Sequence, residues 1–271
     1  MKTLSRAAAL LLAVLALPAA AEPLGLAPER MAVYARRHMV AAANPLAAEA
    51  GREILRAGGS AVDAAIAVQL VLGLVEPQSS GIGGGAFLLN WSAAERRLVT
   101  WDGRETAPAA ATPDQFLGPD GKPLRFMEAV VGGLSVGVPG AMRMLEAAHR
   151  THGRLSWAAL FQPAIRLADG GFPMSPRLAA SLAGDRALFA DRAAAALYYQ
   201  PDGTPKPVGT PLVNAEYAAT LRALADGGAD ALHTGPIAAD IVAAVAGAAR
   251  PGRMTAADLA GYRPVEREPV C

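Results

Sequence analysis

The sequence has little cysteine, few aromatic residues and almost no excess of charge. Cys271 is the only cysteine among 271 residues, so no internal disulfide can form and stability must come from packing. Aromatic residues make up 5% of the chain, and the formal net charge is +1. A balanced charge gives no electrostatic reason for binding nucleic acid or an anionic lipid surface. We therefore expect neither as a partner.

Hydrophobic residues are nonetheless abundant, at 52% of the chain, and alanine dominates them. This composition favours closely packed helices and sheets over a disordered chain. We find no internal repeat. The length is enough for one large domain or two small ones.

The first residues have the pattern of a secretory signal peptide. Lys2 and Arg6 form a positively charged start, residues 7–17 are all apolar, and small residues precede Glu22. The apolar run is shorter than the roughly 20 residues of a membrane span, so cleavage is favoured over an anchor. We expect residues 1–21 to be removed, leaving 22–271 as a periplasmic or secreted protein with no membrane contact.

The early part of the mature sequence predicts strands and two helices. Residues 38–43 read as a short buried strand, and two apolar runs that flank a polar turn, 86–91 and 97–102, read as a hairpin. Asn44 followed by Pro45 is typical of a helix start.

A second helix follows, and the rest of the chain is largely helical. Ser60 and Asp63 resemble a capping box for a helix that ends near residue 75 and is apolar nearly all round, as in a buried core helix. Helical spacing predicts seven further helices, at 139–150, 156–169, 177–183, 187–197, 214–225, 236–249 and 255–259.

Arg104 is the candidate binding residue. It stands just after the second apolar run, where a guanidinium can hold a carboxylate through two parallel N–H bonds. The alternative is a surface arginine paired with Asp102 or Glu105, because such ion pairs are common and contribute little.

Two glycine motifs suggest other chemistries, and their contexts argue against both. Residues 81–86 fit the G-x-G-x-x-G/A dinucleotide pattern, but a strand rather than a helix is expected to follow, so we interpret the run as a close-packing turn. Residues 133–137 fit a G-x-S-x-G nucleophile elbow centred on Ser135, with His233 as the distant histidine. Pro139 would lie inside the helix that an elbow requires, so a loop is favoured.

The remaining histidines offer no complete metal site. His149 and His152 are three residues apart, which permits a metal pair, but Cys271 is a poor further ligand. A solvated helix end is the simpler interpretation. His38 has no identifiable partner. We expect no metal and no cofactor.

Taken together and in order, these segments resemble the amino-terminal part of the large subunit of the γ-glutamyltranspeptidase (glutathione hydrolase) family. The matching segments are MVA at 39–41, PLA at 45–47, AGGSAVDAAIA at 57–67, GIGGG at 81–85, DGRETAP at 102–108, GVPG at 137–140, SW at 156–157, PAI at 163–165, DL at 258–259 and YRPVER at 262–267. The match covers almost the whole mature chain.

The resemblance implies a fold and a mechanism. The family is built as an N-terminal-nucleophile hydrolase, so we expect an α+β fold: an incomplete four-layer αββα sandwich with a largely helical later part. A precursor cuts itself before a Thr, whose hydroxyl attacks the γ-glutamyl amide of glutathione with its own α-amine as base. Water or an acceptor amino acid or peptide then resolves the acyl-enzyme.

The resemblance also assigns the site residues. Arg104 matches the large-subunit arginine that holds the α-carboxylate of the glutamyl group. The family's Thr and oxyanion donors fall beyond the position of Cys271, so no catalytic residue is expected in this chain. The expected partners are glutathione and other γ-glutamyl compounds, the acceptors, and the small subunit released by self-cleavage.

Two alternatives stay open. A related cephalosporin or glutaryl acylase shares many of these sequence segments but acts on a different acyl group. A non-enzymatic exported binding protein could keep the scaffold without the nucleophile. Sequence following Cys271 would separate them: a Thr-Thr-His-like segment favours the transpeptidase, a Ser in its place the acylase, and a stop codon the binding protein.

The signal-peptide prediction can be checked by N-terminal sequencing of exported protein. Because small residues precede Glu22, the mature chain should begin there or within a residue or two. An intact Met1 on material recovered from the periplasm would show an anchor instead.

The 271-residue product by itself should not release p-nitroaniline from γ-glutamyl-p-nitroanilide, because it carries no assigned nucleophile. It should also fold poorly, because half of a sandwich leaves strand edges and an apolar face uncovered. Turnover above a buffer blank would contradict the first statement and make Ser135 the nucleophile to test.

Overall fold

The structure, a computed structural model, describes residues 33–270. The predicted signal peptide and its cleavage site lie outside the described residues. The chain divides into two compact units, residues 1–37 and 38–271. In the first unit, residues 33–37 are exposed and belong to no helix or strand. All elements named below belong to the second unit.

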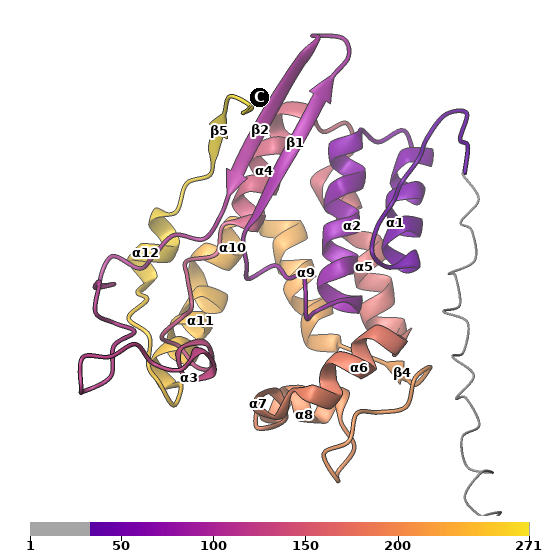
Figure 1. The fold of residues 1–271 in the computed structure, drawn as a ribbon. Helices are drawn as coiled ribbons and strands as arrows, with labels where there is room; N and C mark the ends of the chain where they lie inside the picture. The colour runs from indigo at the N-terminus through magenta and orange to yellow at the C-terminus, as the bar shows by residue number, and fades with distance from the viewer. Residues whose placement is uncertain (1–32, 271) are drawn as a thin grey trace, which may run out of the picture. The chain divides into compact units, whose positions relative to one another are not determined.

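The second unit consists of helices and short strands (Figure 1). Its helices are α1 (Pro45–Arg56), α2 (Ala61–Val75), α3 (Phe126–Val130), α4 (Ala141–His152), α5 (Trp157–Gly170), α6 (Pro176–Gly184), α7 (Arg186–Phe189), α8 (Arg192–Tyr198), α9 (Ala215–Gly227), α10 (Asp230–His233), α11 (Gly235–Gly247) and α12 (Ala256–Gly261). Its strands are β1 (Ala86–Ser92), β2 (Arg97–Gly103), β3 (Phe172–Pro173), β4 (Pro211–Leu212) and β5 (Val265–Arg267). The fold class is therefore α+β, as predicted.

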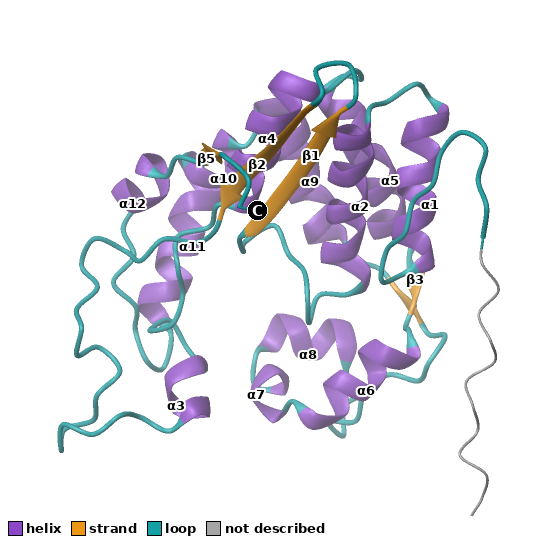
Figure 2. Ribbon diagram, turned by 45° about the horizontal axis from the view of Figure 1, so that its top comes forward, coloured by secondary structure: helices purple, strands orange, loops and turns teal. Residues whose placement is uncertain are grey.

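Helices α1 and α2 begin at the polar side chains that the sequence indicates. The Asn44 Oδ1 accepts the N–H of Leu46 at 3.0 Å, and Pro45 occupies the first helical position, where its missing N–H has no partner to lose. Ser60 and Asp63 form the reciprocal capping box of α2. Helix α2 lies among the other helices of the main core (Figure 2). Its apolar side chains pack with those of α1, α4, α5 and α9. Among the described residues, none of the helices combines the length and apolarity needed to cross a bilayer.

Asp63 connects the start of α2 to the loop between α4 and α5. Its side chain is fully buried. Oδ2 accepts the N–H of Ser60 at 2.9 Å, of Arg154 at 2.9 Å and of Leu155 at 3.1 Å. Oδ1 lies 3.6 Å from Nε2 of His149. One carboxylate thus satisfies three backbone donors, two of them far away in the sequence.

The predicted hairpin is present as β1 and β2, and β5 extends it into a sheet of order β1-β2-β5. In the antiparallel register Ala86 pairs with Gly103, and Asp102 pairs with Val265. Val99 and Trp101 of β2 are buried among helices, and a Cβ at Gly103 would collide with Met144 of α4. The helices therefore cover one face of the sheet.

Along β1, the opposite face of the sheet is apolar and uncovered in the described part of the chain. Phe87, Leu89 and Trp91 alternate along β1 and are 58%, 65% and 59% exposed. Strand alternation places all three on the same side. One sheet with helices on one face and apolar side chains on the other is half of an αββα arrangement.

The strand predicted over residues 38–43 is wrong. The segment has no strand conformation, and Met39 is 60% exposed. A strand requires a neighbour for its N–H and C=O groups, and none of the strands in the described residues pairs with this segment. Its apolar composition alone could not show that.

The later part of the chain also departs from the prediction at several elements. The helix expected over 187–197 is divided into α7 and α8, because Asp191 Oδ1 accepts the N–H of Ala194 at 2.8 Å and starts a new helix. Strand β5 lies in the part expected to be helical, because its pairing partner β2 is far away in the sequence. The short helices α3 and α10 were not predicted either.

Replacing Asp63 by Ala should destabilise the fold by about 3 kcal/mol, because buried donors that lose their acceptor cost about 1–3 kcal/mol. The measurement is the free energy of unfolding in urea, made on the longer precursor that the family resemblance implies. Ser60→Ala is the matched control, because it removes the local half of the same capping box and should cost about 1 kcal/mol. If the two variants lose equal stability, the contacts to Arg154 and Leu155 contribute nothing measurable.

Candidate functional site

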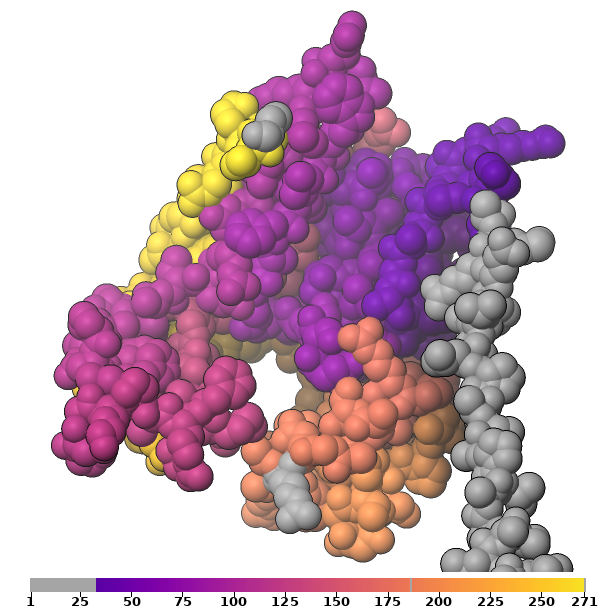
Figure 3. All heavy atoms as spheres, viewed as in Figure 1, coloured from indigo at the N-terminus to yellow at the C-terminus, as the bar shows by residue number. Residues whose placement is uncertain are grey.

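Arg104 follows β2 directly and lines a cavity of about 380 Å³. The cavity walls come from the segment after β2, from the loop before α4 and from the residues before α12. They are Arg104, Glu105, Thr106, Ala107, Pro108, Ala111, Gln115, Phe116, Leu134, Ser135, Val136, Gly137 and Arg253. In the space-filling view the segment that follows β2, magenta at lower left, projects beside an open hollow that separates it from the region of α6 to α8 (Figure 3).

The backbone of Arg104 is held on both sides. Its N–H donates to Oδ1 of Asp102 at 2.9 Å, and its carbonyl accepts the hydroxyl of Tyr262 at 2.7 Å. Tyr262 is 5% exposed and stacks on His233. The side chain of Arg104, by contrast, remains 63% exposed. A fixed backbone thus presents a solvent-accessible guanidinium to the cavity.

The carboxylates beside Arg104 leave most of its guanidinium available. Asp102 pairs with Arg267, whose Nε donates to Oδ2 at 2.8 Å. The backbone N–H of Arg104 and the guanidinium of Arg267 hold the pKa of Asp102 below its ordinary value. The contact between the Arg104 and Glu105 side chains joins Nε to Oε2, at 3.4 Å. Of the two pairings that the sequence left open, only the one with Glu105 forms.

The glycine run at 81–85 is a close-packing turn, as interpreted from the sequence. Strand β1 follows it directly, so it does not open a helix as a dinucleotide fingerprint would. The Gly84 carbonyl accepts the N–H groups of Gly140 and Ala141, both at 3.0 Å, where α4 begins. A Cβ at Gly85 would lie 2.7 Å from the backbone N of Glu105. The run therefore holds the start of α4 and the Arg104 segment together.

Ser135 lines the cavity, but the structure gives it no catalytic partner. It lies in a loop, α4 begins only at Ala141, and its Oγ donates to the Val130 carbonyl at 2.8 Å. His233 is fully buried, its Nδ1 is 3.1 Å from the Leu259 carbonyl, and it does not line this cavity. Burial, aided by Arg143, lowers the pKa of His233 to about 4. Ser135 and His233 are therefore not brought together as a catalytic pair.

The histidines of α4 serve packing. His149 Nε2 lies 2.9 Å from the Leu155 carbonyl, and its ring packs on Trp157. His152 packs edge-on against Trp101. Within residues 33–270 no group of three or more metal-ligating side chains gathers. His38 is exposed, away from any element.

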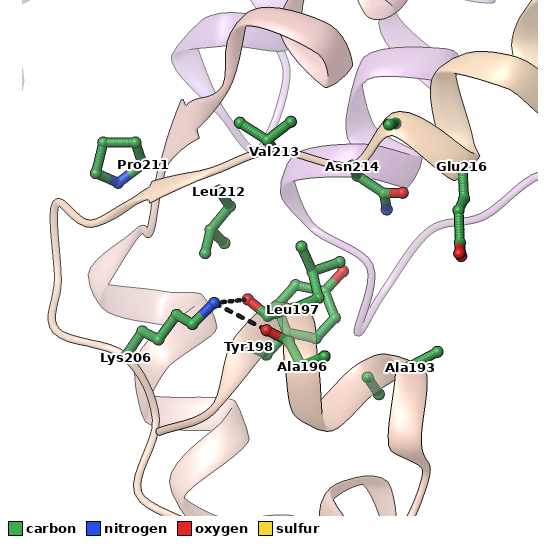
Figure 4. Close-up of a pocket in the computed structure, with 12 residues that line it drawn as sticks. Ala193, Ala196, Leu197, Tyr198, Lys206, Pro211, Leu212, Val213, Asn214 and Glu216 are labelled. Atoms are coloured by element: carbon green, nitrogen blue, oxygen red, sulfur yellow. Dashed lines mark hydrogen bonds between the residues drawn. The ribbon is translucent and has the colours of Figure 1, made fainter. Parts of the chain in front are cut away.

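A larger cavity, of about 670 Å³, lies between α8 and the segment before α9 (Figure 4). Lys206 points into it, but its ammonium donates to the carbonyls of Ala196 at 2.9 Å and Leu197 at 2.8 Å. These are carbonyls of the last turn of α8, where a cation is favourable. Lys206 is thus a helix cap.

Sequence reasoning missed two residues of the Arg104 site. Tyr262 was noticed only as part of a matching segment, and Arg253 was not noticed at all. Both lie more than a hundred residues after Arg104 and reach it through the packing of α12. No local sequence pattern marks Arg253. For Tyr262 the only signal was its place in a segment that resembles the family.

Comparison with known proteins gives a consistent result. A sequence model described as Gamma-glutamyltranspeptidase matches residues 47–271. The glutathione hydrolase proenzyme of Bacillus subtilis (strain 168) is 39% identical over 232 residues, covering 86% of this chain and 39% of that protein. The Acylase ACY 1 proenzyme of Pseudomonas sp. (strain V22) is 36% identical over 248 residues, covering 89% of this chain and 44% of that protein.

A solved structure shows the same fold. The gamma-glutamyltranspeptidase of Helicobacter pylori superposes with a TM-score of 0.83 at 30% identity, covering 89% of this chain and 68% of that chain. The chain spans 39–44% of the length of the two curated relatives named above. The family match extends over most of the chain and includes Arg104, the glycine run and Tyr262. This chain belongs to the gamma-glutamyltranspeptidase family.

Proposed function

We propose that this chain forms the γ-glutamyl-binding part of a glutathione hydrolase, or γ-glutamyltransferase. The observation that carries the proposal is the presentation of Arg104: its backbone is held by Asp102 and Tyr262, and its guanidinium is exposed in a cavity. The names of the B. subtilis and H. pylori relatives support the substrate class.

In this proposal Arg104 orients the substrate. Its exposed guanidinium donates two parallel N–H bonds to the α-carboxylate of the γ-glutamyl group, which fixes the γ-carbonyl at a set distance. The Nε contact with Glu105 stops the guanidinium from turning about its long side chain. Binding energy from the carboxylate thereby positions the amide that reacts.

The chemistry itself is assigned to a Thr in sequence that this chain does not contain. Its hydroxyl oxygen bonds to the γ-carbonyl carbon while its α-amine takes the proton. The amide C–N bond then breaks, and the leaving amine receives a proton. Water or the amine of an acceptor amino acid or peptide attacks the resulting ester, which releases the Thr and yields glutamate or a new γ-glutamyl compound.

The uncovered face of the sheet supports a second part of the proposal. Phe87, Leu89 and Trp91 form an apolar stripe on the side of β1 that no described helix covers. Contiguous apolar surface of this kind is typical of an interface. We assign it to a second sheet from the small subunit that self-cleavage of the full-length precursor releases. The word proenzyme in the names of two relatives supports such processing.

We also propose that the protein acts after export. Lys2, Arg6 and the apolar residues 7–17 support a cleaved signal peptide. The substrates would then be γ-glutamyl compounds and acceptors outside the cytoplasm.

Replacing Arg104 tests the carboxylate clamp in this chain extended to the length of its curated relatives. A desolvated carboxylate that loses its partner costs about 2–5 kcal/mol, so Arg104→Ala should lower kcat/KM for glutathione by about 30-fold or more. Arg104→Lys should recover part of the loss, because it keeps the charge without the fork.

Two controls make the test specific. Arg125→Ala removes another arginine, 86% exposed and paired with Glu128, and should leave kcat/KM unchanged. A γ-glutamyl analogue without the α-carboxylate should be processed equally poorly by the parent and by Arg104→Ala. If Arg104→Ala damages that analogue as severely as it damages glutathione, Arg104 supports the fold and not the substrate.

A further inference from the structure

The Arg104 cavity contains a second guanidinium that the carboxylate clamp does not use. Arg253 lines the same cavity of about 380 Å³ although it lies just before α12, far from Arg104 in the sequence. A cavity of this size is within the range of small-molecule sites. A binding role for Arg253 rests on the proposed function and extends it to the other end of the substrate.

Packing fixes the backbone around Arg253. Met254 is 3% exposed in a small core formed with residues of α11 and α12. The N–H of Gly252 donates to the Val245 carbonyl at 3.0 Å, and the N–H of Gly133 donates to the Arg250 carbonyl at 2.8 Å. A Cβ at Gly252 would collide with the Gly133 carbonyl. The segment that carries Arg253 is therefore seated on the loop that forms the opposite cavity wall.

The charges around the cavity are unbalanced. Its walls carry two guanidinium groups, those of Arg104 and Arg253, but a single carboxylate, that of Glu105. Glu105 is engaged by Arg104. Among the described residues Arg253 forms no ion pair within 4.0 Å, and its Nη1 donates to the Ala110 carbonyl at 3.4 Å.

Asp114 is the other acid near Arg253. It does not line the cavity, and the hydroxyl of Thr112 is the main cause of its lowered pKa, while the charge of Arg253 contributes least. Asp114 and Arg253 lie near each other but form no ion pair. When the α-carboxylate of a substrate occupies Arg104, Arg253 still has no ion-pair partner among the residues that line the cavity.

We propose that Arg253 binds a second carboxylate of the substrate, at the end remote from the γ-glutamyl group. In glutathione this is the carboxylate of the terminal glycine. The guanidinium would donate two N–H bonds to it, in the same geometry that Arg104 offers to the α-carboxylate. Arg253 would thus favour γ-glutamyl peptides that end in a free carboxylate over γ-glutamyl amides that do not.

The test compares donors with and without the far carboxylate, using the chain extended to the length of its curated relatives. Glutathione has the second carboxylate, glutathione glycine ethyl ester has it blocked, and γ-glutamyl-p-nitroanilide lacks it. Arg253→Met keeps the length of the side chain and removes its charge. Because an exposed charge pair is partly screened, we expect kcat/KM for glutathione to fall roughly five- to tenfold. For the other two donors it should change less than twofold.

Arg250→Met is the matched control. Its backbone carbonyl holds the loop of Gly133, but its side chain does not line the cavity, so the preference for glutathione over its ester should persist. Arg253→Lys should keep part of that preference. Equal losses on all three donors for Arg253→Met, or no loss on glutathione, would overturn the proposal.

A binding measurement separates this proposal from the proposed function. Calorimetric titration of the parent and of Arg253→Met with glutathione and with its ethyl ester requires no turnover. If the parent cleaves no donor yet binds glutathione more tightly than the ester, and Arg253→Met abolishes the difference, the hydrolase assignment fails and the carboxylate subsite stands. If the parent binds both equally, the subsite is wrong whether or not the enzyme is active.

Discussion

The hydrogen bond from the Tyr262 hydroxyl to the Arg104 carbonyl is the contact on which the site depends. It joins the end of β2 to the end of α12, two elements that the chain places far apart. Arg143 reinforces it, because its guanidinium donates to the Tyr262 carbonyl at 2.6 Å and to the Ala260 carbonyl at 2.9 Å, and its Nη2 bonds to Asp230. Cations at the carboxyl end of α12 satisfy carbonyls that the helix leaves free. The position of Arg104 is therefore a property of the packed structure and not of its own loop.

Two glycines are as necessary at this junction as the polar contacts, because neither position has room for a side chain. Gly103 lets β2 lie against Met144 of α4, and a Cβ at Gly140 would collide with the Tyr262 hydroxyl. A side chain at either glycine would force apart the elements whose contact places Arg104 at the cavity. This gives a physical reason for glycine in two of the segments that carry the family resemblance.

The two faces of the sheet differ, because helices cover one of them and no described helix covers the other. On one face Val99 and Trp101 are buried against the helices, so this side has the character of a protein core. On the other, the side chains of Phe87, Leu89 and Trp91 remain largely in water among the described residues. The apolar stripe on β1, and the cavity with two arginines and no assigned nucleophile, both support the proposal that further sequence completes the site. The function proposed for the chain follows from this division: it orients a substrate for chemistry supplied from elsewhere.

The sequence by itself determined the local features of this protein. Asn44, Ser60 and Asp63 marked the starts of α1 and α2, and alternation of apolar residues marked the hairpin, because a cap or a strand period depends on residues within a few positions. It also singled out Arg104, although Arg104 became a convincing candidate only through the ordered family segments. What only the tertiary structure decided was everything that depends on a distant partner. Residues 38–43 are no strand because no neighbour pairs with them, Val265–Arg267 is a strand because β2 does, and Arg253 reaches the cavity because α12 packs beside the loop before α4. Such pairings are chosen by burial and hydrogen bonding across the whole chain, and no local pattern of residues records them.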